Sequence, residues 1–276
     1  YVIVFNGEVY NHQALRNDLE LKGITVWHGR SDTEVILAAI STWGIEHAIS
    51  KFIGMFAMAV WDCSENKLHL ARDRIGEKPL YYGWCGNTFI FGSELKALRK
   101  YPSFSNKINR QALTLYLRHM VIPAPLSIYC GIYKLQPGCI LTLGLDESTM
   151  PTDGVIIEAP FSYKGLRLRR YWSLHETVQS GQTSLITNEK EALQLLEIKL
   201  RESIKTQSIA DVPMGAFLSG GLDSSLIAAL MQSESNSKIQ TFTIGFDDKR
   251  YNEAKYASAI AKHLGTEHVE FYVNAT

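Results

Sequence analysis

The sequence predicts two domains: a strand-rich α+β domain, and then an α/β domain built on a doubly wound parallel sheet. The chain has 276 residues, which is about 1.8 times the roughly 150 residues of a common domain. Over residues 1–145, short β-branched and aromatic runs alternate with turns and a few helical patterns, whereas over 189–276 strands alternate with helices. Between them, much of 146–188 is rich in small polar residues, which predicts a linker or insertion.

The elements of the first domain follow from local patterns. Helices are indicated where leucines and isoleucines recur every three to four residues, and hairpins where two apolar runs flank a short polar turn. In chain order we expect a strand at 1–5 ended by the turn signal Asn6-Gly7, helices at 11–22 and 32–43, hairpins at 56–71 and 80–91, and a helix at 110–118.

The second domain begins with a helix-start signature, because Glu191 follows Asn188 by three residues, as in a capping box. A helix carrying Leu193, Leu196 and Leu200 comes next. The elements that follow are a strand at 214–218, a helix at 224–232, a strand at 239–246, a helix at 252–264 and a strand at 268–273. This alternation predicts a parallel sheet with right-handed crossovers.

Composition excludes several classes of protein. Lys+Arg and Asp+Glu are both 28, so the chain lacks the basic excess that nucleic-acid binding by charge needs. The longest apolar run, 52–61, is half the ~20 residues that cross a bilayer, and residues 1–276 contain no charged and apolar segments typical of a secretory signal peptide. Four cysteines without metal-ligand spacing indicate reduced thiols. We therefore expect a cytoplasmic protein without nucleic-acid or membrane partners.

The most specific motif is LSGGLDSS at 218–225, which leaves a strand and opens a helix. Two glycines let backbone N–H groups approach an anion, and the helix start adds its unpaired N–H groups and positive dipole end. Asp223 is expected to hold Mg²⁺. A plain strand-to-helix turn is the alternative. The residues expected to bind phosphate are Ser219, Gly220, Gly221, Leu222, Asp223, Ser224 and Ser225.

SGGLDSS resembles the pyrophosphate-binding loop of ATP pyrophosphatases, which activate a carboxylate or carbonyl as its adenylate. The strand TFTIGF at 241–246, followed by NEA at 252–254, resembles the adenine-side strand of that fold. The resemblance implies ATP and Mg²⁺ as cofactors. In asparagine synthetases the residue before the loop and an isoleucine or valine of that strand contact ATP, which here are Leu218 and Ile244.

The first domain resembles class II glutamine amidotransferases in four segments. These are FNGEVYNH at 5–12, GRSDTE at 29–34, ARDRIGEKPLYY at 71–82 and FGSELKAL at 91–98. Together with the second domain, the likeness to glutamine-hydrolysing asparagine synthetases covers nearly the whole chain outside 146–188. It implies an incomplete N-terminal-nucleophile αββα sandwich at 1–145, lacking its N-terminal part, and the start of the ATP-binding domain at 189–276.

The same resemblance implies a site for glutamine. The side-chain amide of Asn6 and the backbone N–H of Gly7 would be the oxyanion donors, while Glu8 and Asp32 would hold the charged ends of glutamine. The family's nucleophile is an N-terminal cysteine that would precede Tyr1. The four cysteines of the chain read as packing or surface residues, so this chain is expected to be an inactive interior piece of a longer protein.

The function implied is ATP-dependent asparagine synthesis from aspartate, with glutamine as nitrogen donor and β-aspartyl-AMP as intermediate. The small-molecule partners are glutamine, ATP and aspartate, and a homodimer is a further expectation. Two alternatives stay open: a related ligase with another carboxylate acceptor, such as a surface-polysaccharide sugar or a β-lactam precursor, and a non-catalytic glutaminase-like protein.

Two charge runs also leave alternatives open. Residues 72–78 are either a structural loop or a ligand contact. Residues 164–170, in which arginines alternate with leucines, form either a solvated strand face or an anion-binding strand.

Overall fold

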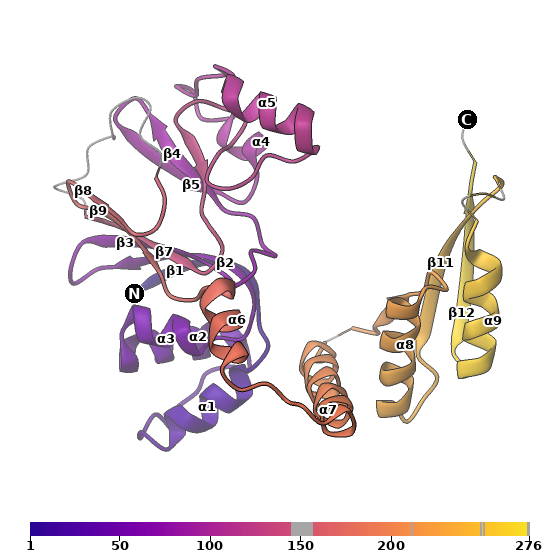
Figure 1. Cartoon of the computed structure of the whole chain (residues 1–276). Helices are drawn as coiled ribbons and strands as arrows, with labels where there is room; N and C mark the ends of the chain where they lie inside the picture. The colour runs from indigo at the N-terminus through magenta and orange to yellow at the C-terminus, as the bar shows by residue number, and fades with distance from the viewer. Residues whose placement is uncertain (145–156, 211, 249, 251, 275–276) are drawn as a thin grey trace. The chain divides into compact units, whose positions relative to one another are not determined.

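The computed structural model describes residues 1–144, 157–210, 212–248, 250 and 252–274 (Figure 1). The chain divides into two compact units, Tyr1–Ser184 and Leu185–Thr276. The first unit is a mixed α/β structure with two antiparallel sheets, and the second carries a parallel sheet.

The larger sheet of the first unit has the strand order β1-β2-β3-β7-β9-β8. Its strands are β1 (Val2–Val9), β2 (Gly54–Asp62), β3 (Lys67–Arg72), β7 (Cys139–Gly144), β8 (Phe161–Tyr163) and β9 (Leu166–Arg170). Alternation along β2 assigns its two faces: Phe56, Met58 and Val60 enter one core, and Ala57 and Ala59 enter the other.

Helices cover one face of this sheet. They are α1 (His12–Glu20), α2 (Asp32–Trp43) and α3 (Ile45–Lys51). The predicted face of α2 is confirmed, because its buried residues are Val35, Ile36, Ala39 and Ile40. The sequence did not indicate α3, a helix of seven residues that begins directly after Gly44.

The second sheet lies on the other face and has the order β5-β4-β6. Its strands are β4 (Tyr81–Cys85), β5 (Thr88–Gly92) and β6 (Ile132–Lys134). Tyr82 and Trp84 of β4 share a core with Leu70 and Leu141 of the larger sheet. Beyond the second sheet lie α4 (Leu95–Leu98) and α5 (Arg110–His119), so Figure 1 shows helices outside both sheets.

The expectation that β1 ends at Asn6-Gly7 is wrong. The strand continues to Val9, and Gly7 pairs with Phe56 of β2. Gly7 has a φ of 144°, and a Cβ atom there would lie 2.7 Å from Cα of Phe56. Glycine is therefore needed here because two strands approach closely. An Asn-Gly pair can mark such a close approach as well as a turn.

The described part of 146–188, which was expected to be a linker or insertion, contains regular structure. Residues 161–170 form β8 and β9, and β9 pairs with β7, so this segment completes the larger sheet. Helix α6 (Leu174–Gln182) follows within the first unit. The strand expected within 164–170 is confirmed as β9, whose Leu166 and Leu168 are buried, whereas β8 and α6 were not expected. Residues 145–156 lie outside the described residues.

The run at 164–170 is a solvated strand face. Arg167 and Arg169 are exposed while Leu166 and Leu168 between them are buried, and Arg169 forms an ion pair with Glu46 at 2.5 Å.

The second unit begins with α7 (Glu189–Gln207), where the side chain of Asn188 accepts a hydrogen bond from the backbone N–H of Glu191, as expected. The parallel sheet has the order β10-β11-β12, with helices between its strands. The elements are β10 (Gly215–Phe217), α8 (Leu222–Glu234), β11 (Gln240–Phe246), α9 (Ala254–Leu264) and β12 (Glu267–Val273). A doubly wound sheet requires a point at which the strand order reverses. The three strands of the described residues follow chain order and contain no such reversal.

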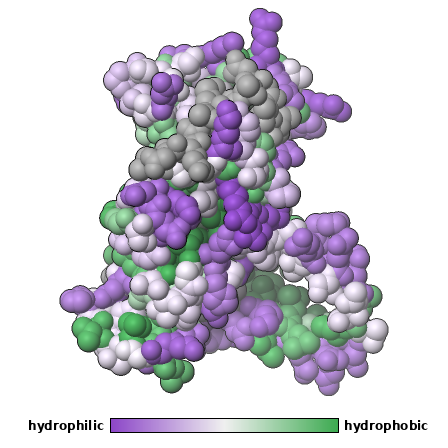
Figure 2. Space-filling model, turned by 90° about the vertical axis from the view of Figure 1, so that its left-hand side faces the viewer, coloured by the Kyte–Doolittle hydropathy of each residue, from purple (hydrophilic) through white to green (hydrophobic). Residues whose placement is uncertain are grey.

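No helix among the described residues is long and apolar enough to cross a membrane. The surface nevertheless includes hydrophobic areas among hydrophilic ones (Figure 2). In α7 the predicted apolar residues Leu193 and Leu196 are exposed, whereas Ile204 is buried.

Candidate functional site

The segment FNGEVYNH lies mostly in β1, which is the edge strand of the larger sheet among the described residues. The N–H of Tyr10 donates to the carbonyl of Ile53, so the even-numbered residues of β1 are hydrogen-bonded to β2. Gly7 and Val9 occupy the alternate positions, where N–H groups face away from β2. In agreement, the N–H of Val9 donates to the Asp32 carboxylate at 3.0 Å.

The neighbouring strand supports this assignment for Gly7. The N–H and C=O of Phe56, which lies opposite Gly7, are both bonded to Asp73 on the far side of β2. The Gly7 N–H is therefore presented at the open edge of β1.

The side chains of Asn6 and Glu8 project from the opposite face to Gly7, and both are exposed. The Asn6 amide donates a hydrogen bond of 3.0 Å to the Ser93 hydroxyl. Asp32 is tied to Val9, the residue after Glu8, so the four expected glutamine-site residues lie in one region. Sequence reasoning missed Ser93, although it lies in the segment FGSELKAL.

Glu34 and Ser31 fix the conformation of the segment GRSDTE by hydrogen bonds to its backbone. Ser31 accepts from the N–H of Glu34 and caps α2, and this places Asp32 in the first turn. Glu34 in turn accepts from the N–H groups of His28 and Gly29, both at 2.8 Å. The hydrogen bond from the His28 backbone N–H is the main cause of the lowered pKa of Glu34. The loop before Asp32 is thus fixed by Glu34, a role the sequence did not reveal.

Residues 72–78 form a structural loop. The Arg72 guanidinium donates at 2.7 Å to three carbonyls, those of Gly76, Lys78 and Leu135. Asp73 is fully buried, and its two oxygens accept from backbone N–H groups of the loop and of β2. These internal bonds use the charges of both residues, which supports the structural alternative.

Two of the four cysteines are buried in surroundings that disfavour a thiolate. All four are free, and Cys85 and Cys139 are buried. Burial raises the pKa of Cys85 and raises that of Cys139 to about 11. A thiol held protonated in this way is a poor nucleophile.

The phosphate-loop segment folds into a compact turn at the carboxyl end of β10. Gly220 has a φ of 82°, and a Cβ atom there would lie 2.7 Å from the Tyr256 Cβ atom on α9. The Ser219 and Ser224 hydroxyls are 2.9 Å apart, and Ser225 donates to the Gly221 carbonyl at 2.6 Å. Gly221 caps α8 without any side-chain cap, which leaves the helix start able to meet an anion.

Asp223 lies exposed in the first turn of α8. The described residues contain no group of three or more metal-ligating side chains. Mg²⁺ commonly takes one or two carboxylates and completes its shell with water and phosphate oxygens, so a single exposed aspartate beside a phosphate loop fits this ion.

A cavity of about 220 Å³ lies beside the loop, where β10 and β11 end. Leu218 and Ile244 both line it, together with Phe242 and Phe246. The backbone of Leu218 is already engaged, because its N–H donates to Phe242 and its carbonyl accepts from the Thr243 hydroxyl. Leu218 is also almost fully buried in the core of the second unit, so Ile244, which is half-exposed, is the more accessible of the two residues.

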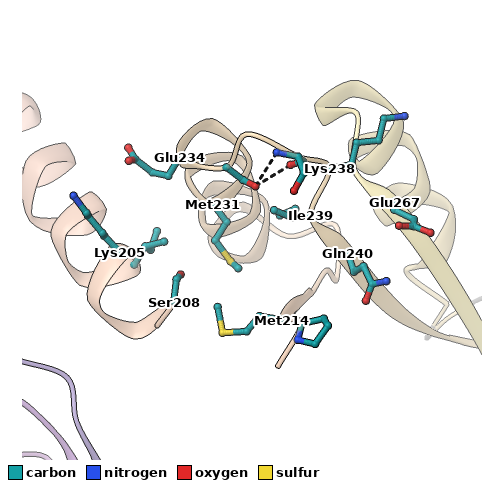
Figure 3. A pocket seen from close by; sticks show the side chains of 13 residues that line it. Lys205, Ser208, Met214, Met231, Glu234, Lys238, Ile239, Gln240 and Glu267 are labelled. Carbon is teal, nitrogen blue, oxygen red and sulfur yellow. Dashed lines mark hydrogen bonds between the residues drawn. The ribbon is translucent and has the colours of Figure 1, made fainter. Parts of the chain in front are cut away.

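A second cavity, of about 640 Å³, lies elsewhere in the second unit (Figure 3). It adjoins the amino ends of β11 and β12, and Met214, Met231 and Lys205 are among its lining residues. None of the glutamine-site or ATP-site residues predicted from the sequence lines this cavity. It is therefore separate from the phosphate loop, which lies at the carboxyl ends of the strands.

Comparison with known proteins agrees with this division. Residues 1–152 match the family model described as glutamine amidotransferase domain, and residues 195–276 match the one described as asparagine synthase. The first match covers more than half of the chain, which therefore belongs to the glutamine amidotransferases. Within that class, the two domain matches together and the names of the relatives identify the family as the glutamine-hydrolysing asparagine synthetases.

Three relatives illustrate the similarity. The asparagine synthetase 2 assigned in Methanocaldococcus jannaschii is 34% identical over 98% of this chain and 48% of its own length. Synthetase 1 of Bacillus subtilis is 33% identical, with 98% and 38% covered, and a Mycobacterium tuberculosis protein is 34% identical, with 100% and 39% covered. The chain thus spans about half or less of these relatives.

A solved structure titled as the allosteric regulatory enzyme of purine biosynthesis aligns with 98% of this chain and 59% of its own, at 14% identity and a TM-score of 0.41. That score is too low to support an argument.

Proposed function

We propose that the chain is part of an enzyme that makes asparagine from aspartate, with glutamine as nitrogen donor and ATP as co-substrate. The observation that carries the proposal is the presence of two candidate binding sites in one chain, called half-sites below because each would serve one half of the reaction. One is the open β1 edge with Asn6 and Asp32, and the other is the serine-glycine loop beside an apolar cavity.

In the first half-site, the substrate carbonyl would meet two donors, the Asn6 amide and the Gly7 N–H, as negative charge develops on its oxygen. Glu8 and Asp32 would hold chiefly the ammonium group of glutamine by charge-assisted hydrogen bonds. The proposal assigns the attacking thiol to an N-terminal cysteine of the whole protein, as the family resemblance implies; the buried Cys85 and Cys139 are poor nucleophiles. The corresponding fold is the N-terminal-nucleophile αββα sandwich.

In the second half-site, residues 219–225 would bind the ATP phosphates, and Asp223 would hold Mg²⁺, which offsets phosphate charge when bound. Leu218 and Ile244 would contact adenine from the walls of the 220 Å³ cavity. The fold proposed for the whole domain is the doubly wound sheet of ATP pyrophosphatases. Aspartate would be activated as β-aspartyl-AMP and captured by ammonia. A cytoplasmic homodimer completes the proposal.

The test uses the protein expressed from its complete reading frame. With glutamine, aspartate and Mg-ATP, we expect asparagine, glutamate and AMP in equal amounts. AMP formation only with another carboxylate would favour the related-ligase alternative. A folded protein that neither hydrolyses glutamine nor consumes ATP would favour the non-catalytic one. Light scattering of the same sample tests the homodimer.

A further inference from the structure

One hydrogen bond joins the two sheets of the first unit at the proposed glutamine site. The donor is the side-chain amide of Asn6 on β1, and the acceptor is the hydroxyl of Ser93, 3.0 Å away and 87 residues later in the chain. The function proposed above assigns no role to Ser93.

Both partners are carried by well-held backbone. Asn6 is paired with Ala57 in the ladder between β1 and β2. Ser93 follows Gly92, which is paired with Tyr81 in the ladder between β5 and β4. Leu98 of α4 packs over Gly92, since a Cβ atom there would lie 3.2 Å from the leucine side chain. The separation of the two side chains is thus set by the packing of two sheets.

A helix-capping role does not account for Ser93. The N-cap residue of α4 is Glu94, and no side chain caps that helix. The Ser93 hydroxyl is half-buried, and Asn6 is its one hydrogen-bond partner found among the described residues.

The bond has a consequence for the amide. An asparagine side chain has two N–H donors, and the terminal torsion of an exposed asparagine is broad and roughly two-fold. When Ser93 accepts one N–H, the plane of the amide and the direction of the second N–H are fixed. An oxyanion donor works by being oriented before charge develops, so this restraint favours the reaction.

We propose that Ser93 is a positioning residue, which holds the Asn6 amide so that its free N–H faces the oxyanion formed during glutamine hydrolysis. The proposal rests on the function proposed above. Ser93 itself touches neither the substrate nor the reacting atoms.

The experiment measures glutamine hydrolysis and ammonia-dependent synthesis by the full-length enzyme. Losing an oxyanion donor outright lowers kcat by about 10²–10³-fold, so Ser93→Ala, which only frees the amide to rotate, is expected to lower kcat by about tenfold. KM for glutamine should stay within about twofold, because the Glu8 and Asp32 contacts remain. Ser93→Thr retains the hydroxyl and should restore kcat to within about threefold of wild type. Ammonia-dependent synthesis should not change.

A double-mutant cycle separates positioning from general structure. Once Asn6→Ala has removed the amide, adding Ser93→Ala should lower kcat less than twofold further. The matched control is Ser103→Ala, an exposed serine, which should leave every rate unchanged.

Three outcomes would overturn the proposal: a full tenfold loss in the Asn6→Ala background, no loss in Ser93→Ala, or a loss that Ser93→Thr fails to rescue. If the wild-type enzyme hydrolyses glutamine, each of these outcomes counts against the role of Ser93 alone and not against the proposed function. A wild-type enzyme that cannot hydrolyse glutamine would overturn both.

Discussion

Asp73 offers the sharpest test of how the first unit is held together. Its side chain is fully buried, and its two oxygens share four backbone N–H donors. One oxygen accepts from Gly76 at 2.6 Å and Glu77 at 2.9 Å, and the other from Phe56 at 3.2 Å and Lys78 at 3.0 Å. The carboxylate thereby joins β2 to the loop that follows β3.

The substitution Asp73→Asn keeps the shape but turns one acceptor into a donor. Two of the four N–H groups then face an NH₂ group and lose their partner. Hydrogen bonds to a charged group are each worth about 1.5–3 kcal/mol, so the variant should lose about 3–6 kcal/mol in the free energy of unfolding of the first unit. That is a large part of the ~5–15 kcal/mol of a typical domain.

The chain provides its own probe and control. All five tryptophans lie before residue 185, so tryptophan fluorescence during urea denaturation reports on the first unit. Asp62 is the matched control, because a single oxygen of Asp62 accepts all three bonds from Ser64 and Glu65. Asp62→Asn retains that acceptor and should cost about 1–2 kcal/mol.

An Asp73→Asn variant that unfolds at the same urea concentration as Asp62→Asn would refute the reasoning. It would mean that water or a local shift satisfies the backbone donors of the loop once the carboxylate is removed.

Three further predictions concern both units. Ile244→Lys should lower the affinity of the full-length protein for Mg-ATP at least tenfold, as measured by calorimetry, since it puts an ammonium group in an apolar cavity. Asp223→Ala should reduce ATP-dependent synthesis at least 100-fold and leave glutamine hydrolysis intact, because the two half-sites lie in different units. Burial lowers the pKa of His69, which is 3.0 Å from the Thr142 hydroxyl. The unfolded state therefore takes up the proton first, and the stability of the first unit should fall as pH drops below about 6.5, less so in His69→Gln.

Each of these has a control. Val269→Lys alters a residue of β12 that is about as exposed as Ile244 but does not line the cavity, and it should bind Mg-ATP normally. Equal losses of both activities in folded Asp223→Ala would contradict the separation of the sites. His175→Gln, at an exposed position, should keep the wild-type dependence of stability on pH, and an identical profile for His69→Gln would count against the burial argument.

Strongly periodic segments were predictable. Helix α2 and the alternation of strands and helices after residue 213 follow from apolar spacing and capping residues, which act within a few positions of one another. Segments that depend on distant partners were not. β9 was expected as a strand, but its place in the larger sheet is set by pairing with β7, which no local pattern indicates.

In the candidate site, too, some features could be predicted from short segments and others depend on distant residues. The loop at 219–225 was indicated by its own residues, whereas Asn6, Gly7 and Asp32 were implied by the resemblance of short segments to a known family. Only the tertiary structure decided that the Gly7 N–H lies on the open edge of β1 and that Ser93 meets Asn6. Strand pairing and the packing of two sheets fix those relations, and both depend on residues tens of positions apart, which no local pattern specifies.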